Sequence, residues 1–255
     1  MAEFAPIGFV RSCFREKFGI PRQPGLAPAA RATLALLPPY SQPAAVRGLE
    51  AFSHVWLVFA FHGVPAGRWQ PTVRPPRLGG NRRLGVFATR SPFRPNPIGL
   101  SAVALDRIAT DRGRVTLHLS GVDLLDGTPV LDIKPYLPYA DAIPAAIGGF
   151  AAEAPETGPA VEFSPAATAF CAAWPGGDLR ELIVQILRQD PRPAYERADP
   201  APKRHGMKLH DCDVRWETRD GVVRVTDILP SITPAPAAGP PRPADKLQWP
   251  RPTVR

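Results

Sequence analysis

Short apolar runs separated by proline and glycine dominate the first 140 residues of the chain. One of them, Val115–Leu119, alternates apolar and polar residues with a period of two, as a strand with one buried face does. Many such runs, without helical periods between them, favour an antiparallel sheet closed into a barrel. The only helical candidate in this half is a short connector at 43–51. The predicted strands are Ile7–Val10, Val55–Phe61, Leu84–Ala88, Leu100–Ile108, Val115–Leu119 and Val130–Ile133.

The pattern changes in the second half of the chain. Residues 140–165 are rich in alanine, glycine and proline and predict a linker. Residues 178–187 then show the apolar spacing of an amphipathic helix, with Asp178 at its N-cap. Val214–Glu217 and Val222–Thr226 flank an Asp-Gly pair, which predicts a β-hairpin.

These patterns predict a mainly β protein in three parts. Residues 1–150 form a single-sheet β-barrel domain, and residues 160–232 form a small α+β domain. Residues 233–255 form a disordered tail, because their proline-rich sequence has little apolar surface to bury. Proline makes up 34 of the 255 residues, which further disfavours long helices in the barrel half.

Composition places the protein among cytoplasmic, soluble proteins. Hydrophobic residues make up 44% and charged residues 21% of the chain, and no apolar run reaches the roughly 18 residues that cross a bilayer. The N-terminus lacks the features of a signal peptide. The three cysteines and five histidines are scattered, so neither disulfides nor a metal site are predicted.

The positive charge of the chain is concentrated in one segment. The formal net charge is +8, and no acidic residue lies between Glu50 and Asp106. A phosphate-binding face, with Arg82 and Arg83 as contacts to an RNA substrate, is one interpretation. A solvated surface in an arginine-rich protein is the alternative. The arginines of this segment are Arg68, Arg74, Arg77, Arg82, Arg83, Arg90 and Arg94.

The common nucleotide-binding signatures are missing from the sequence. It contains neither G-x-G-x-x-G after a strand nor G-x-x-x-x-G-K-[ST], so a Rossmann-type enzyme is disfavoured. Long and unusual phrases are present instead. They are EKFGIPRQPG at 16–25, VRGLEAFSH at 46–54, VRPPRLGGN at 73–81, GVFATRSPFRPNPIGL at 85–100 and LDGTPVLDIKPY at 125–136.

On these phrases the chain resembles the TrmO (TsaA/YaeB-like) family of tRNA methyltransferases. The likeness covers the first 150 residues closely, and QDPRPAY at 189–195 and DVRW at 213–216 extend it. The resemblance implies a barrel that binds S-adenosylmethionine outside any Rossmann fold, as a homodimer with the cofactor near the subunit interface. It also implies the substrate, N6-threonylcarbamoyladenosine beside the tRNA anticodon, methylated on N6.

The resemblance and the local chemistry together give a set of candidate cofactor contacts. Proline fixes the backbone of the 21–24 loop, which limits the entropy lost on gripping a ligand. Arg90 could pair with the carboxylate of the cofactor, and Asp126 could accept hydrogen bonds from ribose hydroxyls. The alternatives are ordinary turns and, for His62, a structural histidine. The candidates are Pro21, Arg22, Gln23, His62, Gly63, Arg90, Leu100, Asp126, Gly127 and Thr128.

The substrate side of the site is predicted from polar residues in the same phrases. Arg94 and Asn96 would face the modified nucleoside, and Lys134 would bind the substrate as well. Methyl transfer to N6 needs a hydrogen-bond acceptor for the N6 proton, and Asp132 and Tyr136 are the candidates. A structural ion pair between Asp132 and Lys134 is the alternative.

Two rival functions are compatible with the sequence. In the first, the chain is a tRNA-binding module without catalysis, which would bind no S-adenosylmethionine. In the second, it methylates a substrate that is not a nucleic acid, and the basic segment is only a surface.

Overall fold

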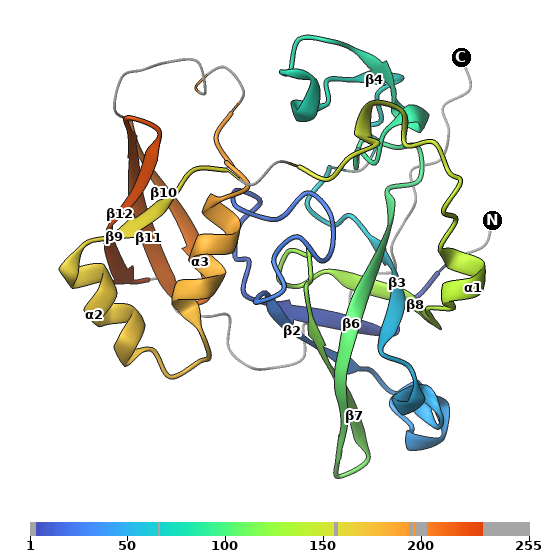
Figure 1. Cartoon of the computed structure of the whole chain (residues 1–255). Coiled ribbons are helices and arrows are strands. Elements are labelled where there is room, and N and C mark those ends of the chain that lie inside the picture. Colours follow the sequence, from blue (N-terminus) through green and yellow to red (C-terminus); the bar gives the residue numbers. More distant parts are fainter. Residues whose placement is uncertain (1–3, 66, 156–157, 194–195, 197–202, 232–255) are drawn as a thin grey trace.

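The computed structural model describes residues 4–65, 67–155, 158–193, 196 and 203–231. It contains a closed barrel and a separate C-terminal sheet with two helices, which lie side by side (Figure 1). The predicted mainly β fold, with a barrel first and a smaller α+β unit after it, is therefore confirmed. The predicted tail at 233–255 lies outside the described residues.

Six strands close the barrel in the order β1-β2-β7-β6-β3-β8, and every neighbouring pair is antiparallel. Alternate residues of β1, β2, β3 and β7 are buried, and leucines such as Leu34, Leu57 and Leu117 fill the interior. The strands are β1 (Gly8–Ser12), β2 (Arg31–Leu36), β3 (His54–Ala60), β6 (Ile98–Asp111), β7 (Arg114–Ser120) and β8 (Pro129–Pro135).

The antiparallel order brings three connections to one end of the barrel. Strands β1, β3 and β7 end where β2, β6 and β8 begin, so loops 13–30, 61–97 and 121–128 share one rim. We call this end the loop rim. The opposite end carries the tight β6–β7 turn and the β2–β3 connection, which Figure 1 shows at the bottom. Nearly all the predicted cofactor residues therefore lie at or beside one rim.

Two expectations for the barrel strands were wrong. Strand β2 was not predicted, because its alanines weaken the alternation that marks a half-buried strand. The segment Leu84–Ala88 is not a barrel strand. It belongs to the long 61–97 loop, where β5 (Leu84–Gly85) pairs with β4 (Thr72–Val73). Two short 3-10 helices, η3 (Pro76–Leu78) and η4 (Val86–Ala88), complete this loop.

Short helices complete the outside of the barrel. The predicted helical connector is present as two 3-10 turns, η1 (Pro43–Val46) and η2 (Leu49–Ala51). After β8 come α1 (Pro138–Asp141) and η5 (Gly149–Ala151). The segment that contains them runs from the far end of β8 back towards the loop rim, on the outside of the barrel (Figure 1).

The C-terminal unit is a four-stranded sheet packed against two helices. Its strands, in spatial order β10-β11-β12-β9, are β10 (Arg204–Leu209), β11 (Cys212–Arg219), β12 (Val222–Pro230) and β9 (Val161–Phe163). The predicted hairpin is confirmed: Asp220 and Gly221 join β11 to β12 with φ of 51° and 75°. These positive values suit an Asp-Gly turn.

The predicted helix is α3 (Leu179–Leu187), and its five apolar positions are buried. Asp178 caps it, since the side chain accepts a hydrogen bond from Glu181 N at 2.9 Å. Helix α2 (Pro165–Ala173) was not predicted. Its short, alanine-rich sequence buries only Ala167 and shows little amphipathic pattern.

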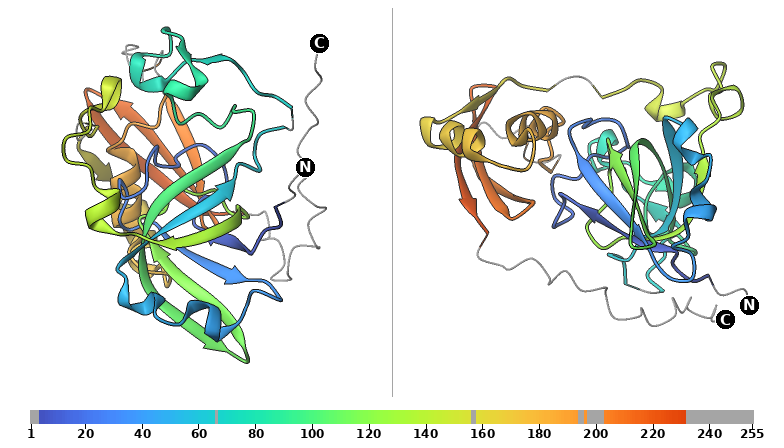
Figure 2. Two further views of the ribbon diagram at one scale, coloured as in Figure 1. Left: turned by 90° about the vertical axis from the view of Figure 1, so that its right-hand side faces the viewer. Right: turned by 90° about the horizontal axis from the view of Figure 1, so that it is seen from below.

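The loop after β1 joins the barrel to the C-terminal unit. Phe14 forms a β-bridge with Leu209, and His210 N donates to Cys13 O at 2.7 Å. Phe18 stacks on Trp216 with ring centroids 5.8 Å apart. Figure 1 and the right view of Figure 2 show this loop between the two units, and one hydrophobic core runs through both. The C-terminal unit therefore braces the loop that carries Pro21, Arg22 and Gln23.

Candidate active site

Two hydrogen bonds tie the three loops together at the loop rim. Arg90 Nη1 donates to Gln23 Oε1, which joins loop 61–97 to loop 13–30. Gly25 N donates to Gly121 O at 2.8 Å, which joins loop 13–30 to loop 121–128. Pro21 is buried and Arg22 is exposed, so proline anchors the loop while the guanidinium reaches the surface. Gln23 and Arg90 are therefore brought together, as the prediction of a shared site requires.

Glycine lets the 61–63 segment approach the loop from β1. Lys17 Nζ donates to Gly63 O, and a Cβ at Gly63 would lie 2.7 Å from Lys17 Cε. His62 lies beside the next loop, since a Cβ at Gly127 would be 3.9 Å from His62 Nε2. Partial burial of the ring lowers the pKa of His62, although the Asp126 backbone and charge act in the opposite direction. A neutral imidazole at this rim can accept as well as donate a hydrogen bond.

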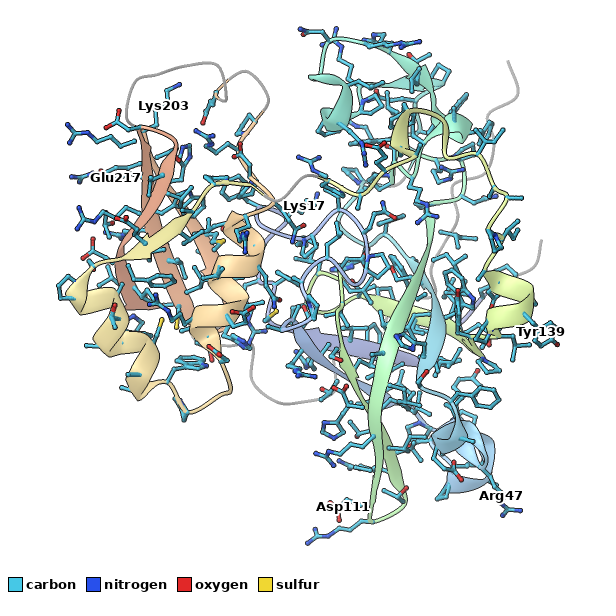
Figure 3. The ribbon with its side chains drawn as sticks, viewed as in Figure 1. Lys17, Arg47, Asp111, Tyr139, Lys203 and Glu217 are labelled. Atoms are coloured by element: carbon cyan, nitrogen blue, oxygen red, sulfur yellow. The ribbon has the colours of Figure 1, made fainter. Side chains whose placement is uncertain are left out.

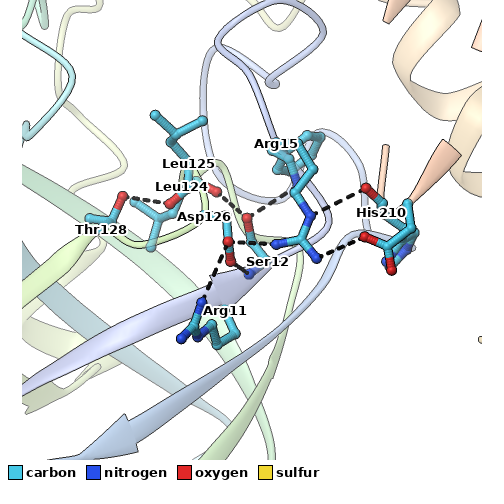
Figure 4. Close-up of polar contacts among 10 residues, drawn as sticks. Arg11, Ser12, Arg15, Leu124, Leu125, Asp126, Thr128 and His210 are labelled. Atoms are coloured by element: carbon cyan, nitrogen blue, oxygen red, sulfur yellow. Dashed lines mark hydrogen bonds and ion pairs between the residues drawn. The ribbon is translucent and has the colours of Figure 1, made fainter. Parts of the chain in front are cut away.

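Asp126 is held by the chain itself. Ser12 N donates to Oδ1 at 2.9 Å, Arg15 Nη1 lies 2.5 Å from Oδ2, and Arg11 lies 3.8 Å from it (Figure 4). The carboxylate is 11% exposed. Its predicted role as an acceptor for ribose hydroxyls has no support in this geometry, because both oxygens already have partners.

The turn that contains Asp126 keeps its shape through its own residues. Thr128 Oγ1 donates to Leu125 O at 2.7 Å and is 3% exposed. Gly127 has φ of 79°, which favours glycine at this position. Thr128 and Asp126 therefore fix the turn, and what the turn offers to a ligand is the backbone around Gly127.

The other predicted residues of the rim differ in their exposure and in their contacts within the chain. Arg94 Nη1 donates to Thr89 O at 2.7 Å and to Val86 O at 3.2 Å, so this guanidinium stabilises its own loop. The guanidinium carbon of Arg94, Cζ, also lies 5.6 Å from the centre of the Phe87 ring. Asn96 and Leu100 are exposed. Arg82 and Arg83 are exposed too, and Arg83 donates to Thr72 Oγ1 at 2.9 Å.

The predicted proton acceptors have partners of their own within one chain. Strand β8 begins at the loop rim, so at about 3.3 Å per residue Asp132 lies roughly 10 Å and Tyr136 roughly 20 Å along it. Asp132 pairs with Lys134 at 2.9 Å, which confirms the structural ion pair that was the alternative. Tyr136 packs on Trp56, with ring centroids 5.7 Å apart.

Sequence analysis missed a carboxylate at the rim, Asp123. Ser101 Oγ donates to Asp123 Oδ1 at 2.7 Å. Burial raises the pKa of Asp123 to about 6, against the opposing effects of the Ser101 hydrogen bond and the Arg90 charge. The sequence carried one signal for it: an aspartate within the otherwise apolar run Val122–Leu125. A charge in such a run needs a partner or a function.

Neither a metal site nor a membrane helix is found in the described part of the chain. No group of three or more histidine, cysteine, aspartate or glutamate side chains could hold a metal ion there. Among the same residues, no helix is both long and apolar enough to span a bilayer.

Comparison with known proteins places the barrel and the C-terminal unit in a class of tRNA methyltransferases. The family model for the tRNA-methyltransferase O N-terminal domain matches residues 9–142, and the TrmO C-terminal domain model matches residues 156–231. The chain belongs to the TrmO family.

Individual relatives cover nearly the whole chain. A tRNA (adenine(37)-N6)-methyltransferase of Escherichia coli is 48% identical, over 89% of this chain and 98% of its own. A putative S-adenosylmethionine-dependent methyltransferase of Pseudomonas aeruginosa, RcsF, is 56% identical, over 88% and 96%. The crystal structure of TrmO from Pseudomonas aeruginosa superposes with a TM-score of 0.73 at 48% identity, over 90% of this chain and 98% of that chain.

Proposed function

We propose that this protein is an S-adenosylmethionine-dependent tRNA methyltransferase that methylates N6 of N6-threonylcarbamoyladenosine next to the anticodon. The observation that carries the proposal is the meeting of three loops at one rim, where Arg90 binds Gln23 and Gly25 binds Gly121. The names of two relatives support the proposal, since both are tRNA (adenine(37)-N6)-methyltransferases. The site therefore has to position two ligands, a methyl donor and an adenine.

The cofactor side of the site fits the donors and acceptors at the rim. Arg90 is the cation for the carboxylate of the cofactor, and Arg22 is exposed beside the buried Pro21 on the loop that Arg90 contacts through Gln23. Backbone at Gly127 is open to close approach, and His62 is a neutral polar partner beside it. S-adenosylmethionine supplies the activated methyl group, and the chain supplies orientation.

The RNA side of the site is the 61–97 loop. Arg82 and Arg83 are exposed in it, and so are the rings of Trp69 and Phe87, which are 51% and 74% exposed. Arginines bind phosphates, and exposed aromatic rings stack on bases that are splayed out of a loop. This pairing of charge and aromatic surface suits an anticodon loop.

The apolar surface outside the barrel supports a homodimer. Tyr139 points away from α1 into solvent (Figure 3), and it is 87% exposed. Ile143 and Ile147, four residues apart, are 67% and 96% exposed, and with Tyr139 they gather large apolar side chains on one exposed segment. We propose that a second copy covers this segment, in a cytoplasmic dimer with the cofactor near the interface.

The two units divide the work in this proposal. The barrel domain, residues 1–150, carries the cofactor and the chemistry. The domain at 160–232 braces the loop with Pro21, Arg22 and Gln23, because Phe18 and Phe14 of that loop pack on it.

Methyl transfer to tRNA tests the proposal directly. The purified protein is incubated with S-adenosylmethionine and tRNA that contains N6-threonylcarbamoyladenosine, and the nucleosides are then analysed by mass spectrometry. A gain of one methyl group on that nucleoside is expected. If calorimetry detects no binding of S-adenosylmethionine, the protein is instead the non-catalytic tRNA-binding module. Methylation of small acceptors but not of tRNA would favour the other rival function.

A further inference from the structure

We propose that Asp123 is the catalytic base that accepts the N6 proton during methyl transfer. This inference rests on the proposed function. The N6 lone pair forms the new bond to the methyl carbon, and the carbon–sulfur bond breaks with its electron pair going to sulfur. The N6–H bond releases its proton to the Asp123 carboxylate, which later passes it to water. The adenine N6 then remains neutral in the product.

The position of Asp123 suits this role. It follows Gly121, whose carbonyl oxygen holds loop 13–30 through Gly25 N at 2.8 Å. It also lies close enough to Arg90 to feel the charge of that guanidinium, and Arg90 binds Gln23. The carboxylate therefore lies where the loops with the predicted cofactor residues meet.

The Asp123 carboxylate is held by neutral hydrogen-bond donors. Ser101, in β6 and 1% exposed, holds Oδ1 from the barrel interior at 2.7 Å. A second hydrogen bond to the carboxylate comes from the backbone of Asp123 itself, and both hydrogen bonds favour the ionised form. A carboxylate that is anchored by a hydroxyl and by its own backbone, with no ion pair to an arginine or lysine among the described residues, is oriented and can still accept a proton.

Asp126 and Asp132, which the sequence also singled out, are paired with cations instead. Both Asp126 oxygens have partners in Ser12 and the arginines beside it. Asp132 is neutralised by Lys134. An arginine or lysine partner stabilises the charged form of a carboxylate and so weakens it as a base.

Burial makes Asp123 a stronger base than an ordinary aspartate. Loss of hydration raises the pKa of its carboxyl to about 6, and Arg90 is the charged group that opposes this effect. Near neutral pH the group is therefore mostly ionised, and it takes up a proton more readily than a solvated aspartate would. A base is most effective when its pKa lies near the working pH.

The Asp123→Asn variant tests the proposal. The amide keeps the shape and the Ser101 contact, but it cannot accept the proton. We expect kcat for tRNA methylation to fall by about 100-fold or more, the usual contribution of a general base, while the Kd of S-adenosylmethionine stays the same. Asp106→Asn is the matched control, because Asp106 also accepts from a serine, Ser120 Oγ at 2.8 Å. Its kcat should stay within about twofold of the wild type.

The dependence on pH gives a second readout. The carboxylate is the active form, so kcat of the wild type is full above the pKa of Asp123 and falls as pH drops through about 6. Ser101→Ala removes a hydrogen bond that favours the ionised form, which raises the pKa of Asp123. The acid limb of the profile, where kcat falls, should therefore move to higher pH in this variant. Carbon-13 NMR of the free protein should show the same order: one carboxyl titrating near pH 6, absent in Asp123→Asn and shifted upward in Ser101→Ala.

Several outcomes would overturn the inference. They are an unchanged kcat in Asp123→Asn, a loss confined to cofactor affinity, or an acid limb that Ser101→Ala does not move. If Asp123→Asn fails to fold, the Ser101→Ala profile still decides. A wild-type protein that does not methylate tRNA would reject the proposed function itself, so the two failures are distinguishable.

Discussion

Asp126 shows how the role of a single residue depends on its neighbours. Its sequence context, Asp-Gly-Thr-Pro, is that of a turn that could face a ligand. In the structure, the carboxylate faces the end of β1 and pairs with Arg15, which also reaches Asp211 at 3.3 Å. The residue therefore joins the 121–128 loop to the loop from β1 and, through Arg15, to the C-terminal unit.

Replacement of Asp126 by asparagine should cost stability more than cofactor affinity. The amide can still accept from Ser12 N, but Arg15 loses its less exposed carboxylate partner and keeps only Asp211. The side chains of Asp126 and Arg15 are 11% and 26% exposed. We expect the free energy of unfolding to fall by about 2 kcal/mol, below the value for a fully buried pair. Urea denaturation measures this loss, and calorimetry measures the Kd of S-adenosylmethionine.

The control is Asp213→Asn, which breaks a more exposed pair with Arg215 and should cost less than about 1 kcal/mol. Equal losses of unfolding free energy in the two variants would show that the Asp126–Arg15 pair stabilises the protein no more than an exposed pair does. A large loss of cofactor affinity with unchanged stability would restore the predicted ribose contact.

At the scale of elements, the 61–97 loop is the largest addition to the barrel. It has only two short strands and two 3-10 turns of its own, and Arg94 binds carbonyl oxygens within it. Arg77 Nη2 also donates to Glu153 O, which ties it to the segment after β8. The loop therefore presents its exposed arginines from a backbone that is partly fixed.

Charge reversal of Arg82 and Arg83 should weaken tRNA binding and leave cofactor affinity unchanged. Each lost phosphate contact reduces the salt dependence of binding by roughly one unit in the logarithmic slope. We expect affinity for tRNA to fall about 10- to 100-fold at low salt, measured by filter binding across a salt series. The slope should decrease by about two.

The matched control reverses Arg112 and Arg114, which lie at the turn on the opposite end of the barrel. Net charge changes equally in both double variants, so a general electrostatic effect would weaken them equally. That result would exclude the 61–97 loop as the RNA site.

At the scale of the whole molecule, apolar surface stays uncovered on the outside of the barrel. Tyr139, Ile143 and Ile147 all lie on the segment that follows β8, and this segment contains only α1 and η5 as regular elements. A chain that folds as one continuous core, yet leaves these side chains in solvent, has a surface suited to a second subunit.

Light scattering should give a mass of twice the 27.6 kDa of one chain. Ile147→Asp places a charge in the proposed interface and should shift the protein towards monomer at micromolar concentration. Leu229→Asp, at a 41% exposed apolar position on β12, is the control and should remain dimeric. A wild-type monomer, or a dimer unaffected by Ile147→Asp, would reject this interface.

The sequence alone determined the local elements and the family. Helix α3 and the Asp220–Gly221 hairpin were predictable, because their apolar spacing and turn residues act within a few neighbours along the chain. The long phrases identified the family for the same reason: they are contiguous. Strand β2 and helix α2 were missed, because alanine-rich segments take their structure from what they pack against.

Only the tertiary structure decided which polar groups meet. Arg90 and Gln23 are 67 residues apart, and Asp126 and Arg15 are 111 apart. Asp123 receives its hydrogen bond from Ser101 across 22 residues, and its pKa comes from burial that no local pattern records. The physical reason is that hydration and charge pairing act through space, whereas periodicity and turn preferences act along the chain. The closure of the barrel joins these distant residues into one rim.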